Sequence, residues 1–434
     1  MTESLLATEG DTARWTCPFC LLLCDNLSVR ASASGASLEL ADGECASARI
    51  GLARFTSTPS AATPLIDGHA VDPADAVAAA ARMLAASRQP LFGGLGTDVA
   101  GARGVYRLAC ATGAICDAAG GAALMQAVRS LQDRGGFGTT LAEVRTRADL
   151  IVCLGHLPSG EAAEFFARCG LGEEGRVPQR HVALLGGVAA DQAGLAALAS
   201  LSGVTTEAIP LHGDLFSTVA LLSALVARRA VRDVPLALAA LADRLRAARY
   251  AVIVGETGRL PAQGALIIEG VHRIVGTLNA TTRAAAMWLG GGNGAGTVNE
   301  VFTWLSGLPL RSRAGPAGLE HEPLCFDAVR LLADAAVDCL LWISSFDAGS
   351  APPATQAPLI VLGHPDLASS AARIGSVFLP VSTPGIGSAG HLFRADGGAV
   401  LPLVPLYRDT LPTLADVLDS ITQGVAALRA RSGP

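Results

Sequence analysis

The chain of 434 residues contains no lysine, so every fixed positive charge belongs to an arginine. Charged residues make up 16% of the sequence, aromatic residues only 4%, and the formal net charge is −6 at pH 7. A protein that binds nucleic acid needs a surplus of basic side chains to neutralise phosphates. The missing surplus argues against a nucleic-acid partner.

Long apolar runs are also missing. No stretch approaches the roughly 18 consecutive apolar residues of a membrane span. The first residues, MTESLLATEGDTAR, are polar and acidic, whereas a secretion signal needs a cationic flank and an apolar stretch. We therefore expect a cytoplasmic protein with no membrane partner. In that compartment clustered cysteines more often bind metal or carry out redox chemistry than form disulfides.

The residues that are abundant predict an α/β protein. Half of the sequence is apolar, and a composition rich in alanine, leucine, valine and glycine suits tightly packed α/β layers. A single core stops growing at about 250–300 residues, so more than one packed unit is expected. The positive mean hydropathy of +0.43, combined with the low charge, indicates that partner chains cover much of the surface.

Three segments are predicted from changes in pattern. Residues 1–57 contain the cysteine cluster and a short alternating stretch, NLSVRASASGASLELADG, that predicts a β-hairpin with a Ser-Gly turn. Residues 58–249 and 250–434 alternate helical segments with apolar runs that end in glycine, which predicts two Rossmann-like parallel-sheet domains. The predicted strands are 90–96, 113–121, 148–156, 180–187, 207–214, 250–256, 337–345, 357–366 and 375–382, followed by a β-like piece over 391–403. The predicted helices include 73–87, 234–249 and 413–432, the last with Thr413 and Asp416 at capping-box spacing.

Four cysteines near the start have the spacing of a metal site. Cys17, Cys20 and Cys24 follow a C-x2-C-x3-C pattern, and Cys45 comes about twenty residues later. Three thiolates in one loop and a fourth farther on suit a four-iron four-sulfur cluster. Structural zinc, which favours two C-x2-C pairs, and free or vestigial thiols are the alternatives.

These cysteines also carry a resemblance to a known family. Cys17-Pro-Phe-Cys20, Cys24-Asp-Asn and Cys45 with Gly51 resemble the cluster module of the molybdopterin and tungstopterin oxidoreductases, and most of all the B-type chain of formylmethanofuran dehydrogenase. The resemblance continues through PLFGGLG, GAICDAAGG and GFGTTLAEVRTRADLIVCLG (136–155), and resumes at PGIGSAGHLFRADGGAVLP. It implies that family's fold over nearly the whole chain, without the C-terminal barrel domain.

The resemblance also indicates that the metal site is degenerate. In active members, a cysteine ligand of the pterin-bound metal and a neighbouring histidine follow an aspartate that ends a strand. Aligning that aspartate with Asp117 puts Ala123 at the cysteine position and Leu124 at the histidine position. A methyl group cannot ligate a metal and leucine cannot donate a proton. In active members a lysine near the last cysteine helps to connect the cluster and the pterin. This chain has Arg49 in that neighbourhood, which keeps the positive charge but not the reach or hydrogen bonding of lysine.

Other candidate sites have weaker support. Cys116 could replace the missing ligand only in a register shifted by seven residues, and its apolar strand setting favours core packing. The same reading applies to Cys110, Cys153, Cys169, Cys325 and Cys339. Two glycine-rich loops, 93–101 and 290–296, could admit a pyrophosphate or could be close-packed turns. His156 and His364 each follow a Leu-Gly strand end and could face the crevice where α/β sheets bind ligands, but lone loop histidines are more often solvated or act as caps. The shared Leu-Gly-His ends indicate either duplication or a strand-glycine pattern common in α/β folds.

Two functions remain in competition. The favoured one is a non-catalytic chain that resembles the B-type component of bacterial formyltransferase/hydrolase complexes, with A-, C- and D-type subunits as partners. In such a complex a formyl group passes from formyl-tetrahydromethanopterin through a methanofuran-like carrier to formate, without electron transfer. The alternative is an active tungsten- or molybdenum-pterin dehydrogenase. The favoured function implies that the pterin-bound metal is absent and leaves the iron-sulfur cluster in doubt.

Overall fold

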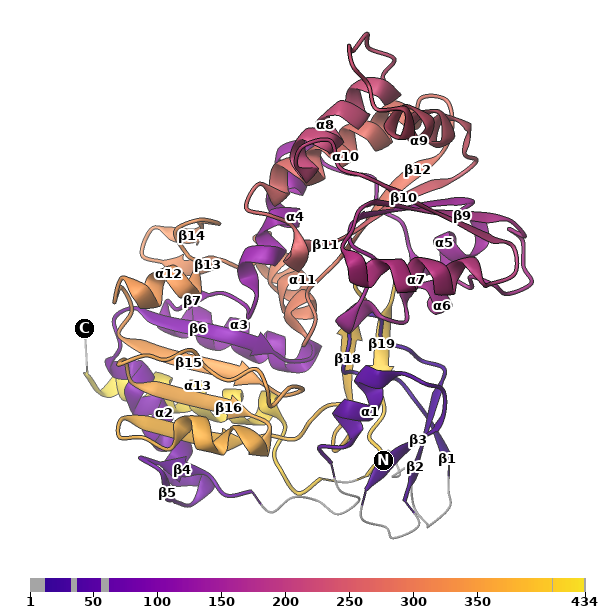
Figure 1. Cartoon of the computed structure of the whole chain (residues 1–434). Coiled ribbons are helices and arrows are strands. Elements are labelled where there is room, and N and C mark those ends of the chain that lie inside the picture. Colours follow the sequence, from indigo (N-terminus) through magenta and orange to yellow (C-terminus); the bar gives the residue numbers. More distant parts are fainter. Residues whose placement is uncertain (1–11, 33–36, 56–61, 408, 433–434) are drawn as a thin grey trace. The chain divides into compact units, whose positions relative to one another are not determined.

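The computed structural model describes residues 12–32, 37–55, 62–407 and 409–432, and its ribbon is drawn in Figure 1. These residues divide into two compact units. Unit 1 comprises Met1–Gly121, Gly291–Arg394 and Val400–Pro434, and unit 2 comprises Ala122–Gly290 and Ala395–Ala399. Each unit is built around its own β-sheet.

The main sheet of unit 1 has nine strands in the order β14-β13-β7-β6-β15-β16-β17-β4-β5. Its five central strands, from β7 to β17, run parallel. They carry the near-continuous apolar runs expected of strands covered on both faces. The parallel strands are β6 (Pro90–Gly96), β7 (Ile115–Cys116), β15 (Cys339–Ser344), β16 (Leu359–Gly363) and β17 (Ser376–Pro380). Antiparallel edges are formed by β4 (Leu65–Ile66) with β5 (His69–Ala70) and by β13 (Ser312–Gly315) with β14 (Gly318–His321).

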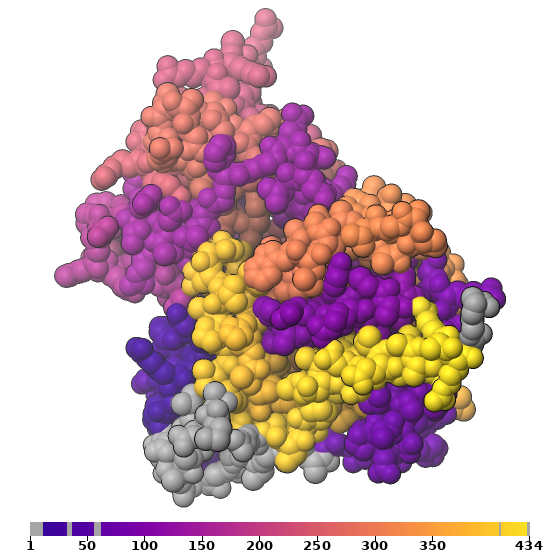
Figure 2. Space-filling view, turned by 180° about the vertical axis from the view of Figure 1, so that it is seen from behind, coloured from indigo at the N-terminus to yellow at the C-terminus, as the bar shows by residue number. Residues whose placement is uncertain are grey.

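Three helices pack side by side on one face of this sheet: α2 (Pro73–Ala86), α3 (Val99–Thr112) and α13 (Leu414–Ser432). Figure 2 shows α13 in yellow, lying between the purple helices α2 and α3. Glycine makes this close packing possible, because a Cβ at Gly104 of α3 would lie 3.1 Å from the Leu418 side chain. The opposite face is covered by α12 (Ala328–Ala333) and the 3₁₀ segment η3 (Pro365–Ala371). Helix α11 (Ala295–Ser306) packs beside α3.

The cysteine-bearing segment belongs to unit 1 and is not a separate core. Strands β1 (Thr12–Trp15), β2 (Leu27–Ala31) and β3 (Leu38–Asp42) form a small antiparallel sheet, followed by helix α1 (Ala46–Leu52). The predicted hairpin is confirmed as β2 and β3, while its Ser-Gly turn lies outside the described residues. A second hairpin, β18 (Gly390–Phe393) with β19 (Val400–Leu403), matches the predicted β-like piece.

Unit 2 holds a five-stranded parallel sheet in the order β10-β9-β8-β11-β12. Its strands are β8 (Leu150–Gly155), β9 (Arg180–Gly186), β10 (Val204–Ile209), β11 (Ala251–Glu256) and β12 (Ala284–Leu289). Helices α8 (Leu215–Val226), α9 (Leu236–Ala247) and α10 (Gly264–Leu278) bury one face of this sheet. The remaining helical segments are α4 (Gly121–Arg134), α5 (Leu141–Arg147), η1 (Gly160–Ala162), α6 (Phe165–Arg168), α7 (Ala189–Ala199) and η2 (Thr257–Arg259).

The 136–155 stretch, which carries much of the family resemblance, builds the start of this sheet. Thr140 caps α5 by accepting the Glu143 N–H at 3.2 Å. Asp149, just before β8, accepts the Arg249 and Tyr250 N–H groups, both at 2.9 Å. These bonds fix the register of β8 beside β11, so the stretch has a structural role here.

The expected domain boundaries need correction. A division at residues 249 and 250 would separate β8 from β11, yet these strands pair in one sheet, and β6 pairs with β15 across the same boundary. The described residues of the expected 1–57 segment likewise belong to unit 1. Unit 2 is inserted into unit 1, an arrangement that no local pattern reports because strand pairing depends on partners distant in sequence.

Individual elements were predicted closely, with two shifts. The strand expected over 207–214 lies at Val204–Ile209, and the run 113–121 contributes only the two residues of β7. Within the described residues, no helix is both long and apolar enough to cross a membrane.

Candidate functional site

The four motif cysteines lie together in unit 1 and are almost completely buried. Cys17, Cys20 and Cys24 share one loop between β1 and β2, which the Cys17 N–H closes by donating to the Cys24 carbonyl at 2.9 Å. Cys45 comes immediately before α1. Burial, followed by the neighbouring Cys20 and Cys45 thiols, raises the pKa of Cys17 well above its usual range. Cys20 and Cys45 therefore lie near enough to Cys17 to affect its thiol, and a metal site at the four cysteines stays a prediction.

The donor chemistry of four thiols fits an iron-sulfur cluster, but the observed arrangement does not. Among the described residues, no group of three or more histidine, cysteine, aspartate or glutamate side chains is arranged to hold a metal ion. In this conformation the loop is a packed apolar turn.

Aromatic packing holds this loop in place. The rings of Trp15, Phe19, Phe55 and His364 follow one another with centroid separations of 5.8, 6.0 and 5.0 Å. Gly51 lies beneath Phe19, where a Cβ would come within 2.1 Å of the ring. The Trp15 indole N–H donates to the Gly385 carbonyl at 2.7 Å. The cysteine loop is thus attached to the rest of unit 1 by ring packing and one buried hydrogen bond.

The strand-ending aspartate on which the metal-site alignment rests has a structural role. Asp117 directly follows β7, and its carboxylate accepts from Arg311 Nε at 3.2 Å and from the Ala328 N–H at 2.9 Å. Arg311 donates in turn to the Pro323 carbonyl at 2.5 Å and to Asp327. Burial raises the pKa of Asp117, while the Arg311 charge and the Ala328 N–H oppose that rise.

Ala123 and Leu124 lie in the first turn of α4. Both side chains are half-buried, and the Ala123 methyl lies 3.9 Å from the position that a Cβ on Gly258 would occupy. Neither side chain has an atom that could ligate a metal or move a proton. Cys116, the cysteine nearest to this turn in sequence, is fully buried in β7, and its pKa is raised by burial.

The first glycine-rich loop, 93–101, is packed against the chain itself. A Cβ at Gly94 would lie 2.6 Å from the Ile343 carbonyl oxygen, so glycine is needed for close strand packing. The helix that follows is capped internally, because the Asp98 carboxylate accepts the Gly101 and Ala100 N–H groups at 3.0 and 3.3 Å.

The second glycine-rich loop lies against the first. Within 291–296, the backbone of Gly294 is so close to Thr97 that a Cβ on Gly294 would lie 2.4 Å from the Thr97 carbonyl oxygen. Asn293 donates to the Ser344 hydroxyl at 3.3 Å. The structure therefore favours close-packed turns for both loops.

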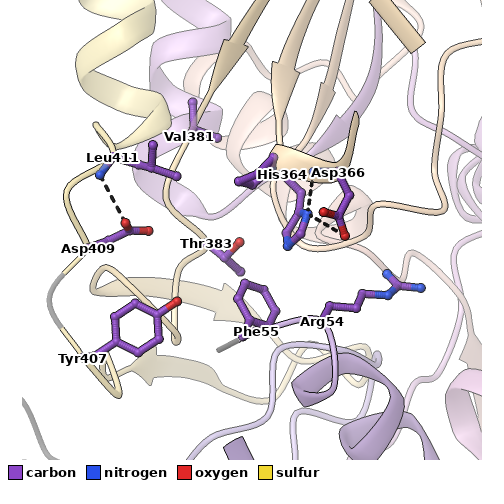
Figure 3. Close-up of a pocket in the computed structure, with 10 residues that line it drawn as sticks. Arg54, Phe55, His364, Asp366, Val381, Thr383, Tyr407, Asp409 and Leu411 are labelled. Atoms are coloured by element: carbon purple, nitrogen blue, oxygen red, sulfur yellow. Dashed lines mark hydrogen bonds and ion pairs between the residues drawn. The ribbon is translucent and has the colours of Figure 1, made fainter. Parts of the chain in front are cut away.

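A small pocket opens at the carboxyl ends of β16 and β17 (Figure 3). It has a volume of about 130 Å³. Its walls come from four segments of unit 1 and are formed by Arg54, Phe55, His364, Pro365, Asp366, Val381, Thr383, Tyr407, Asp409 and Leu411. Sequence reasoning identified only His364 in this set, since the other residues carry no motif and meet only through the fold.

His364 is a buried, neutral residue of this pocket. Its Nδ1 accepts the Asp366 N–H at 3.1 Å and so caps η3. Burial and the Arg54 charge lower the pKa of His364, against the opposing effect of Asp366, Asp347 and Asp409. Arg54 itself forms an ion pair with Asp347 at 2.5 Å. Burial and Asp409 raise the pKa of the nearby Tyr407 phenol, which stays protonated.

The other candidates have structural settings. His156 of unit 2 lies 3.4 Å from Asp191, whose carboxylate also accepts the Leu157 and Val188 N–H groups. Arg49 is exposed and pairs with Glu44 at 3.0 Å. Cys153, Cys169 and Cys339 are buried in the cores, whereas Cys110 and Cys325 are exposed.

Comparison with known proteins gives a consistent picture. No protein-family model matches the chain. A protein of Methylorubrum extorquens, the B-type chain of the formyltransferase/hydrolase complex Fhc, is 31% identical over 337 residues, which cover 77% of this chain and 89% of that relative. Among solved structures, the crystal structure of the formyltransferase/hydrolase complex FhcABCD from the same organism, bound to methylofuran, contains a similar chain. The match has a TM-score of 0.72 and 26% identity, and it covers 85% of this chain and all of that one.

Proposed function

Because this chain belongs to the family of B-type chains of formyltransferase/hydrolase complexes, we propose that it is the non-catalytic structural component of such a complex. The complex moves a formyl group from formyl-tetrahydromethanopterin, by way of a methanofuran-like carrier, to formate in one-carbon metabolism. Other chains carry out that chemistry, the D-type subunit in transfer and the A-type subunit in hydrolysis. The cell compartment is the cytoplasm.

One observation carries the non-catalytic assignment. The turn after Asp117 presents Ala123 and Leu124, so neither a thiolate nor an imidazole is available for a pterin-bound metal. Formyl transfer and hydrolysis exchange no electrons, and a component of this complex can therefore lose its redox centre without loss of flux. The same substitutions count against the alternative function, an active dehydrogenase.

The chain acts within a hetero-oligomer of A-, B-, C- and D-type subunits. Large apolar side chains on its surface support this assembly, including Leu236, Ile374, Val329 and Trp304, which are 89%, 86%, 76% and 64% exposed. Partner chains of such a complex would bury side chains of this kind.

The fold is proposed to be the core of a molybdopterin oxidoreductase. The insertion of one parallel-sheet unit into another, preceded by a small antiparallel cysteine module, supports that assignment. We propose that the module now serves packing, since its four motif cysteines are buried and its Trp15 and Phe19 rings pack on each other.

Metal analysis of the native complex, purified without oxygen, tests the proposed function. We expect no stoichiometric tungsten, molybdenum or pterin, together with formate release from formyl-tetrahydromethanopterin and no reduction of a viologen dye by formate. Stoichiometric tungsten or molybdenum with pterin, or formate-dependent dye reduction, would contradict the proposal. The iron content of the same sample decides whether Cys17, Cys20, Cys24 and Cys45 hold a cluster.

A further inference from the structure

The carboxyl edge of a parallel sheet is where α/β proteins bind nucleotides, at the point where the strand order reverses. In unit 1 that point lies between β6 and β15, because the next strand in the chain, β7, pairs on the other side of β6. The phosphate of such a ligand normally lies at the N-terminus of the helix that follows the first strand, where backbone N–H groups are free. In unit 1 that helix is α3.

An acidic side chain already occupies the N-terminus of α3. Asp98 is 5% exposed, and both of its carboxylate oxygens accept backbone N–H groups of the first turn. A phosphate placed there would find these N–H groups already bonded to Asp98, and the buried Asp98 carboxylate would repel it.

The space above Asp98 and β6 is filled by the chain itself. Gly294 and Asn293 pack on Thr97 and Gly96, with no room for a Cβ at either glycine. On the β15 side, the Ser345 N–H donates to the Gly96 carbonyl at 2.7 Å, and the Thr383 hydroxyl donates to the Ser345 carbonyl at 2.7 Å. The crossing point between β6 and β15 is therefore bridged by direct contacts.

The pocket beside His364, which lies on this edge, is too small for a cofactor. Pockets that hold small molecules and cofactors usually measure about 300–1,000 Å³, whereas the one beside His364 measures about 130 Å³. A pterin with its nucleotide does not fit that volume.

We propose that unit 1 is closed from within, with Asp98 and residues 291–296 standing where a cofactor phosphate would bind. This inference rests on the proposed function and goes beyond it. The loss of cofactor binding then has two independent causes, the missing ligands at positions 123 and 124 and the closed edge. Restoring the ligands alone will not restore the site.

The first test restores those ligands within the complex. The double variant Ala123→Cys/Leu124→His is produced with its partner subunits in a host that makes pterin cofactors, supplied with tungstate and molybdate. An active dehydrogenase of the family, produced in the same host, is the positive control. We expect tungsten, molybdenum and pterin to stay at the wild-type background in the assembled variant. If the variant holds stoichiometric metal and pterin while the wild type holds none, the inference is overturned and the proposed function stands. If the wild type itself holds stoichiometric metal and pterin, the proposed function is overturned.

A second test does not depend on cofactor loading. Gly294 and Gly307 flank α11, and both have φ +77°, but a Cβ meets the Thr97 backbone only at Gly294 and nothing within 4 Å at Gly307. The two alanine variants therefore share the backbone strain and differ only in the contact that closes the edge. We expect Gly294→Ala to lower the melting temperature of the complex by at least about 3 °C more than Gly307→Ala. Equal losses would show that the loop is not tightly packed on β6 and would overturn the inference.

Discussion

The guanidinium of Arg311 lies 3.2 Å from the Asp117 carboxylate, measured from Nε to Oδ1, and the two side chains are only 4% and 2% exposed. The pair joins the end of β7 to the segment that enters β13. In the family that this chain resembles, the corresponding aspartate precedes the metal ligand. Here its carboxylate accepts from Arg311 and from the Ala328 N–H.

Breaking this buried pair should be costly. Arg311→Met leaves the Asp117 carboxylate without its cation, and removal of one partner of a buried pair typically costs about 3–5 kcal/mol. Asp117→Asn/Arg311→Met also removes the buried Asp117 charge, leaves only the partly exposed Asp327 without its partner, and should cost clearly less than the single variant. Thermal unfolding of the purified complexes compares the two. A double variant that is less stable than Arg311→Met would contradict the assignment of the pair.

Packing beneath Phe19 makes Gly51 sensitive to substitution. A Cβ there would lie 2.1 Å from the ring, so Gly51→Ala should destabilise the cysteine module by about 1–3 kcal/mol. Limited proteolysis and thermal unfolding should both report the loss. Adding Phe19→Leu makes room for the methyl group and should recover part of the stability, whereas a further loss in the double variant would mean that the ring is not the cause.

The buried His364 predicts a stability change near neutral pH. Its pKa is lowered in the folded state, whereas histidine in an unfolded chain titrates near pH 6.5. Between the two values the unfolded chain binds more protons, so stability falls as the pH drops through about 6.5 towards the folded-state pKa. Replacing His364 with glutamine should flatten this part of the profile, measured by urea unfolding between about pH 7.5 and about pH 5.5. The exposed His69 provides the matched control. An unchanged slope in His364→Gln would contradict the prediction.

Burial divides the ten cysteines into two reactivity classes. Cys110 and Cys325 are exposed and the other eight are buried, and burial raises the pKa of Cys169 and Cys339 to about 12. Because the thiolate is the reactive form, a Cys110→Ser/Cys325→Ser variant should show almost no fast reaction with a disulfide reagent. Trp15→Phe in that background removes the hydrogen bond to Gly385 and should expose the motif thiols. Mass spectrometry identifies the labelled cysteines. Fast labelling of Cys17 or Cys20 while Trp15 is still present would contradict the burial of these two thiols.

Exposed apolar side chains predict that the chain depends on its partners. Expressed alone it should be poorly soluble, and co-expression with A-, C- and D-type subunits should raise the soluble yield several-fold. Trp304→Ser, at a residue that is 64% exposed, should improve the solubility of the single chain more than Trp342→Ser, which removes a buried ring from the core. A single chain that behaves as a monodisperse monomer with sharp two-state unfolding would argue against large partner surfaces.

The sequence by itself determined the local elements and the chemistry that is lacking. The helix expected over 413–432 is α13, and Thr413 Oγ1 accepts the Asp416 N–H at 3.2 Å, as the capping-box spacing predicts. The apolar runs became buried parallel strands because their residues have no polar face to present to water. The spacing of the four cysteines predicted a metal site, which stays a prediction. The sequence alone also shows that the chain has no lysine, no thiol at position 123 and no imidazole at position 124.

Only the tertiary structure decided how those elements pair and whether a site remains open. The insertion of unit 2 depends on β8 pairing with β11, about a hundred residues later, and no local preference encodes that contact. Sequence alone could not distinguish a phosphate-binding glycine loop from a close-packed one, because both need residues without a Cβ. The two kinds of loop differ in the group that lies beside the glycine, a ligand phosphate or the chain itself. Beside Gly294 lies the backbone of Thr97.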